Sequence, residues 1–127
     1  MKRELQQKLY DDFPSLYQQK DWDMKTTCLC WGIETGDGWE PLIRKLSEEI
    51  MAIDTNVQAV QVKEKYGGLR FYTSSIDRDT FDKVQDLISE AEDESYKICE
   101  NCGSREDVTQ SEGWIRTECG KCREKRQ

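Results

Sequence analysis

Four cysteines near the C-terminal end of the chain are spaced as two C-x2-C pairs, a pattern that can hold a metal ion. Cys99 pairs with Cys102 and Cys119 with Cys122, and sixteen residues separate the pairs. A two-residue gap lets both thiolates of a pair turn toward one ion, and four thiolates supply the tetrahedral shell of structural zinc. The spacing therefore predicts one Zn2+ ion per chain, bound by Cys99, Cys102, Cys119 and Cys122. An iron–sulfur cluster and four unrelated buried thiols are the alternatives.

The same pattern predicts that the metal is structural rather than catalytic. Catalytic zinc keeps one coordination position open for water or substrate, whereas four cysteines fill the shell. The chain contains no histidine, which removes the commonest general base and every nucleophilic site that depends on it. A Walker-type phosphate loop and a dinucleotide-binding motif are also missing from the sequence. We therefore expect no enzymatic activity and name no catalytic residue.

Cys28 and Cys30 fall outside the metal pattern. We interpret them as small core residues on opposite faces of a strand, because free cysteine is among the most buried residue types. A reactive thiol or a second metal is the alternative.

Basic and aromatic residues interleave around a glycine turn in the middle of the chain. Such a surface could contact an acidic protein edge or a phosphate-bearing base. The alternative is the ordinary solvated face of a sheet. With the tryptophan of the nearby Gly-Asp-Gly-Trp string, the candidate ligand- or partner-binding residues are Trp39, Lys63, Lys65, Tyr66, Arg70 and Tyr72.

Hydrophobic periodicity predicts about three helices. A four-residue apolar repeat places the first over residues 1–13, ending at Pro14. A second is expected over residues 39–53, and a third begins near Asp79 or Thr80 and runs to Cys99.

Strand-forming residues predict a small antiparallel sheet. Residues 57–65 and 69–74 form a hairpin about Tyr66-Gly67-Gly68, and residues 26–33 form a third strand. The predicted fold is therefore α+β: a core domain over residues 1–98, then a zinc ribbon over residues 99–127 that ends in a short basic tail. Trp114 and Ile115 are expected to form a strand in which Trp114 covers the metal site.

The charge distribution limits the partners that we expect. The formal net charge is -7, which opposes nonspecific binding to nucleic acid. Residues 77–100 hold nine acidic and three basic residues, whereas residues 113–127 hold five basic and two acidic ones. Both runs are also typical of solvated surfaces. The chain has no apolar run of membrane-spanning length and no signal-peptide core, so we expect a cytoplasmic protein with no membrane partner.

Several strings in the sequence resemble a family of small uncharacterised proteins of tailed bacteriophages and prophages. They are Asp12-Phe13-Pro14, Cys28-Leu29-Cys30-Trp31-Gly32, Gly36-Asp37-Gly38-Trp39, the run from Val62 to Tyr72, and the two cysteine pairs with Gly113-Trp114 before the second. The resemblance covers nearly the whole chain. One position departs from the resemblance: the family is associated with a further cysteine where this chain has Thr35. This departure weakens the hypothesis of a second metal site at Cys28 and Cys30.

The resemblance implies a phage protein in the cytoplasm of a host bacterium and carries no activity. Small non-enzymatic phage proteins commonly act by binding. An acidic helix, exposed aromatic residues and a rigid zinc module favour a protein interface, so the preferred partner is a host protein such as a defence effector. A sponge that sequesters a nucleotide signal is the second hypothesis, and a zinc ribbon that binds nucleic acid is the third.

Overall fold

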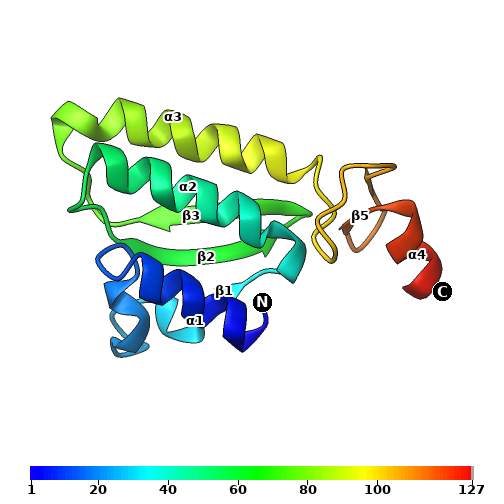
Figure 1. The fold of residues 1–127 in the computed structure, drawn as a ribbon, viewed down its shortest axis with the longest axis horizontal. Helices are drawn as coiled ribbons and strands as arrows, with labels where there is room; N and C mark the ends of the chain where they lie inside the picture. The colour runs from blue at the N-terminus through cyan, green and yellow to red at the C-terminus, as the bar shows by residue number, and fades with distance from the viewer. Residues whose placement is uncertain (127) are drawn as a thin grey trace.

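The chain folds as an α+β protein, shown as a computed structural model that describes residues 1–126 (Figure 1). This confirms the predicted fold class. Gln127, the last residue of the predicted ribbon and basic tail, lies outside the described residues. The α-helices are α1 (Arg3–Asp12), α2 (Glu40–Ile53), α3 (Arg78–Ser95) and α4 (Gly120–Arg126). The strands are β1 (Ile33–Glu34), β2 (Ala59–Lys65), β3 (Gly68–Thr73), β4 (Thr109–Gln110) and β5 (Thr117–Glu118). Three short 3-10 helices are η1 (Gln18–Asp21), η2 (Leu29–Trp31) and η3 (Asp37–Trp39).

The central sheet has the order β1-β2-β3. Strands β2 and β3 form the predicted antiparallel hairpin, and Lys65 pairs with Gly68. The two residues between them, Tyr66 and Gly67, have φ angles of 54° and 84°. Two consecutive positive φ angles match the right-handed twist of the flanking strands, which is why a glycine stands at this turn. Strand β1 pairs with β2 in parallel, so the sheet is mixed rather than wholly antiparallel.

The predicted strand over residues 26–33 is wrong in its position. Only Ile33 and Glu34 join the sheet, and the preceding residues form η2. The hydroxyl of Thr27 accepts a hydrogen bond from the N–H of Leu29 at 3.1 Å. Such local side-chain contacts offer the backbone an alternative to a strand ladder, so this strand-forming composition folds as a turn.

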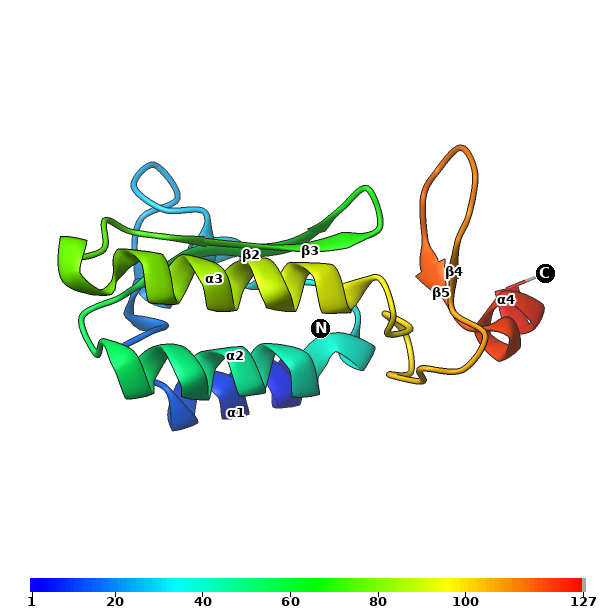
Figure 2. The same cartoon turned by 90° about the horizontal axis from the view of Figure 1, so that it is seen from above.

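Helices α1 and α2 lie on one side of the sheet, and α3 lies along the outer edge of β3 (Figures 1 and 2). Helix α3 begins after Asp77, so Asp79 and Thr80 lie inside it and neither is the predicted N-cap. Strand β3 is an edge strand, and α3 covers its free N–H groups. The hydroxyl of Ser95 accepts from Leu69 N–H at 2.9 Å, and the carboxylate of Glu92 accepts from Phe71 N–H at 3.1 Å. Helix α3 thereby blocks the edge against further strand pairing.

Apolar side chains between these layers form one core. Its largest fully buried members include Trp39, Tyr17, Leu9 and Ile43. Ile98 is also buried and is followed directly by the first cysteine of the metal pattern. The core therefore continues up to the metal module, by which we mean residues 99–126. The predicted division into two domains between residues 98 and 99 stays a prediction.

Candidate metal centre

The four cysteines of the two C-x2-C pairs converge on one point. Their Sγ atoms all lie within 4.8 Å of one another, and the Sγ atoms of Cys102 and Cys119 are 3.7 Å apart. Sulfurs in a regular tetrahedron at about 2.3 Å from a central ion lie about 3.8 Å apart. The donor set and its spacing therefore fit a single tetrahedral metal ion.

The first pair lies on a tight loop after α3. The N–H of Cys99 donates to the carbonyl of Ser104 at 2.8 Å, and the N–H of Gly103 donates back to the carbonyl of Cys99 at 2.9 Å. These two bonds close the loop, which we call the first knuckle (Cys99–Ser104). Cys99 is buried, whereas Cys102 is exposed at the rim of the cluster.

The second pair lies between β5 and α4. The backbone N–H of Cys122 lowers the pKa of the Cys119 thiol to about 7, whereas burial raises the pKa of the Cys122 thiol to about 12. Four thiols this close cannot all ionise without a cation between them, because like charges at short distance repel. The cluster therefore favours a bound cation over four free thiolates.

A buried acid ties the two halves of the metal module together. The side chain of Glu118 is 4% exposed and forms an ion pair with Arg126 at 3.1 Å. It also accepts from the side-chain amide of Asn101 at 3.2 Å. On the same module Arg123 pairs with Asp107 at 3.0 Å. Two of the basic residues of the predicted tail are thus engaged within the module, which leaves less of its charge for phosphate groups.

The Gly-Asp-Gly-Trp string is the surface on which the first knuckle docks. The N–H of Gly38 donates to the carbonyl of Glu100 at 2.7 Å, and the N–H of Gly36 donates to the Glu100 carboxylate at 2.8 Å. A Cβ atom at Gly38 would overlap the carbonyl oxygen of Cys99 and the nitrogen of Gly103. Only glycine lets the two backbones approach this closely.

The tip of the β2–β3 hairpin docks on the other half of the module. The hydroxyl of Thr117 donates to the carbonyl of Gly67 at 2.5 Å. A Cβ atom at Gly67 would overlap the side chain of Ile115. The metal module therefore contacts the core domain at two turns that are far apart in the sequence.

Trp39 is not a partner-binding residue, contrary to the prediction. Its side chain is fully buried, and its indole Nε1–H donates to the carbonyl of Ile98 at 2.9 Å. The reason is the docking of the first knuckle on the turn that precedes Trp39, a contact that cannot be read from the sequence. Trp39 fastens α2 to the end of α3 and thereby positions Cys99.

The other five predicted binding residues gather at the hairpin; we call Lys63, Lys65, Tyr66, Arg70 and Tyr72 the hairpin cluster. Lys63 pairs with Arg70 across the strands, so both side chains lie on the sheet face opposite Val62 and Phe71. Tyr66 is 68% exposed and Tyr72 41% exposed. Three members make local contacts: Lys65 lies over the Tyr66 ring at 5.5 Å, and Arg70 donates to the carbonyl of Leu69 at 2.9 Å.

Two further expectations about burial are wrong. Trp114 does not cover the metal site; it is 80% exposed on the loop between β4 and β5, because the short strand begins only at Thr117. Cys28, just before η2, is exposed and Cys30, within η2, is half-buried, because their segment is not a strand with a buried face.

Sequence reasoning missed two residues that hold the module in place, Glu100 and Thr117. Glu100 lies between Cys99 and Cys102, and Thr117 lies two residues before Cys119. Each forms a hydrogen bond with a turn of the core domain. The only sequence signal for them was their position beside the cysteine pairs.

The comparisons with known proteins gave no relative. No protein-family model, curated protein or solved structure matches the chain. Within residues 1–126 no helix is both long enough and apolar enough to cross a membrane.

Proposed function

We propose that this chain is a zinc-stabilised, non-enzymatic protein that acts by binding a protein partner. The observation that carries the zinc assignment is the convergence of four Sγ atoms within 4.8 Å. Four cysteinates fill the preferred tetrahedral shell of Zn2+, so the ion would serve structure rather than catalysis. A multi-iron cluster would hold its cysteines around several metal atoms rather than one.

The zinc would hold the first knuckle against the Gly-Asp-Gly-Trp turn and Thr117, two residues before Cys119, against the hairpin tip. Both turns would thereby be fixed in place. The hairpin cluster would then be presented on a rigid support at the edge of the module. Exposed tyrosines beside basic residues are typical of interface anchors, and their charge complements an acidic surface on the partner. Within the setting that the phage resemblance implies, the partner is a host protein in the bacterial cytoplasm, such as a defence effector.

The test is capture of partners from bacterial lysate with the tagged chain and two variants. Lys63→Glu reverses a half-buried charge of the hairpin cluster, and Lys125→Glu makes the same charge change on the exposed surface of α4. We expect Lys63→Glu to lose the partner and Lys125→Glu to keep it. Arg70→Glu serves as a second cluster variant, checked for folding because Arg70 also contacts its own strand. Equal retention by all variants would contradict a role for the hairpin cluster.

A nucleotide ligand is the second candidate, favoured by the exposed ring of Tyr72. Tyr72 faces Gln61 across the strands and lies two positions from Arg70, so a base could stack on the ring with its phosphate near the guanidinium. A nucleotide that binds only the folded chain raises the melting temperature in a concentration-dependent way. We expect Tyr72→Ser to abolish this increase in melting temperature. The nucleotide hypothesis would be discarded if a screen of linear and cyclic nucleotides raised the melting temperature of the wild type in no case.

A further inference from the structure

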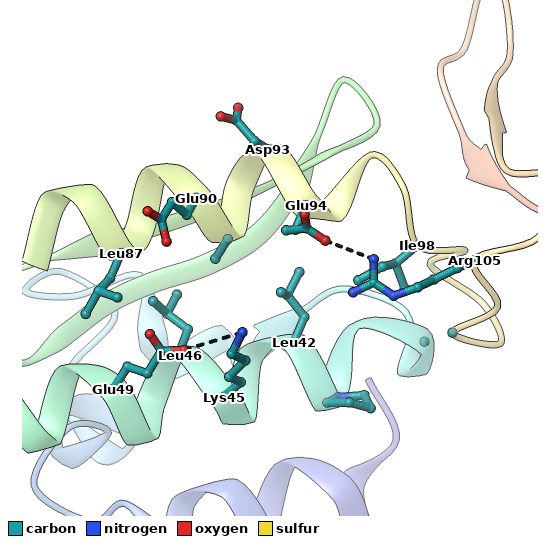
Figure 3. A pocket seen from close by; sticks show the side chains of 14 residues that line it. Leu42, Lys45, Leu46, Glu49, Leu87, Glu90, Asp93, Glu94, Ile98 and Arg105 are labelled. Atoms are coloured by element: carbon teal, nitrogen blue, oxygen red, sulfur yellow. Dashed lines mark hydrogen bonds and ion pairs between the residues drawn. The ribbon is translucent and has the colours of Figure 1, made fainter.

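A groove of about 710 Å³ lies between α2 and α3, away from the hairpin cluster (Figure 3). Its floor is apolar. Leu42 and Leu46 from α2 and Leu87 from α3 point toward one another across it, and Ile98 closes the end near the metal module (Figure 3). Leu87 is half-buried, so part of this floor still faces solvent.

The rim of the groove is charged and mostly acidic. It carries the carboxylates of Glu49, Glu90 and Glu94 and the cations of Lys45 and Arg105. Asp93 also lines the groove, but its carboxylate points away from it, on the opposite side of α3 (Figure 3). Both cations are already engaged, Lys45 with Glu49 at 3.8 Å and Arg105 with Glu94 at 2.9 Å.

One acid on the rim keeps its charge uncompensated. Glu90 is exposed and makes no ion pair within residues 1–126. Residues 77–100, which include α3, hold nine acidic against three basic residues, so the field around the groove is negative. This charge attracts a cationic partner and repels phosphate groups of nucleic acid and anionic lipid.

The metal module forms one end of the groove. Gly103 and Arg105 come from the first knuckle and the residues after it, and they face Gly38 at the start of α2. The first knuckle therefore fixes the length of the groove and places Arg105 against Glu94. The shape of the groove thus depends on the metal site.

We propose that this groove is the docking site for a cationic amphipathic helix of a protein partner. An apolar side chain of that helix would contact Leu42 and Leu87, while a lysine or arginine faces Glu90. A groove between two helices with an apolar floor and charged sides is the usual receptor for such a helix. The inference rests on the proposed function and adds a second contact surface, with opposite charge to the hairpin cluster.

The probe is a fluorescent peptide of about 16 residues, long enough to form a helix, with leucine on one face and lysine on the other. A matched peptide carries glutamate in place of every lysine. Binding to the full-length, zinc-loaded chain is followed by fluorescence anisotropy. We expect the lysine peptide to bind and the glutamate peptide to bind at least about tenfold more weakly.

Variants of α3 locate the binding surface. Glu90→Lys should weaken the lysine peptide at least about tenfold, because the uncompensated rim charge is reversed. The matched control, Asp79→Lys, makes the same charge change at an exposed position of α3 that does not line the groove, and should have an effect of less than about threefold. Leu87→Gln, which keeps every charge, should weaken binding through the floor.

Three outcomes would overturn the inference. One is equal weakening by Glu90→Lys and Asp79→Lys, which would mean attraction by net charge alone. Another is failure of the wild-type chain to bind the lysine peptide. The last is concentration-dependent dimerisation that Glu90→Lys abolishes, since the occupant would then be a second copy. None of these affects the lysate capture with Lys63→Glu, so the inference and the proposed function fail separately.

Discussion

The backbone N–H of Gly38 donates a hydrogen bond to the carbonyl oxygen of Glu100 at 2.7 Å. Gly38 precedes α2, and Glu100 lies between the first two cysteines of the cluster. This bond and the indole bond from Trp39 to Ile98 at 2.9 Å make the metal module part of the packing of the core domain. Metal binding and domain stability should therefore be coupled.

Purified protein should carry about one zinc ion per chain, and Cys102→Ser should lose it and unfold the segment from Cys99 onward. Elemental analysis and hydrogen exchange measure the two effects. Cys28→Ser is the matched control, because Cys28 is an exposed cysteine outside the cluster, and it should keep the metal. Wild-type protein without metal, with all six thiols free, would refute the site.

Gly38→Ala should lower the free energy of unfolding by about 2 kcal/mol or more, because the new Cβ atom overlaps backbone atoms of Cys99 and Gly103. Urea denaturation of the metal-loaded protein measures the loss. Gly113→Ala is the comparison, because its Cβ atom would meet nothing within 4 Å. Only its positive φ angle should lower the free energy of unfolding, by about 1 kcal/mol. An equal loss in the two variants would mean that the close approach at Gly38 matters little.

Trp39→Phe should cost about 1–3 kcal/mol beyond any change in packing, because it leaves the buried carbonyl of Ile98 without its donor. The same substitution at Trp22, which is 45% exposed, should be nearly neutral. Thermal or urea unfolding separates the two. The free energy of unfolding could instead be unchanged in Trp39→Phe and fall only when Trp39→Phe is combined with Cys102→Ser, below that of either single variant. The bond from Trp39 would then stabilise the protein only without metal.

Glu92→Gln should change how stability depends on pH. Burial raises the pKa of the Glu92 carboxyl above its ordinary value of 4.5, although the hydrogen bond from Phe71 N–H opposes this. The folded state therefore holds this proton more tightly than the unfolded state. The resulting contribution to stability is present below pH 4.5 and is lost as the pH rises through the folded-state pKa.

Glutamine keeps an acceptor for Phe71 N–H and cannot ionise. The stability of Glu92→Gln relative to wild type should therefore increase as the pH rises from below 4.5 toward neutrality. Urea unfolding of both proteins over this range gives the difference, in which metal loss at low pH is common to both. A difference that does not change with pH would contradict the raised pKa.

The sequence by itself determined the local features whose signal lies within a few residues. The C-x2-C spacing identified the four converging cysteines, and apolar periodicity identified α1, α2 and α3 but not α4. Together with the strand-forming runs it gave the α+β class. Glycine chemistry placed the hairpin turn at Tyr66-Gly67-Gly68, and the structure keeps Tyr66 and Gly67 in the turn while Gly68 begins β3. These predictions succeeded because spacing, periodicity and turn preference act along the chain.

The tertiary structure alone decided what each turn and aromatic residue contacts. Trp39 and Trp114 look alike in the sequence, since each follows a glycine, yet one is fully buried and the other 80% exposed. The difference arises because the first knuckle packs on the turn before α2, whereas within residues 1–126 no segment covers the side chain of Trp114 on the loop between β4 and β5. Likewise, Thr27 turned a strand-forming segment into η2 through a local hydrogen bond. Burial depends on which distant segments meet, and that is settled by the packing of the whole domain rather than by local pattern.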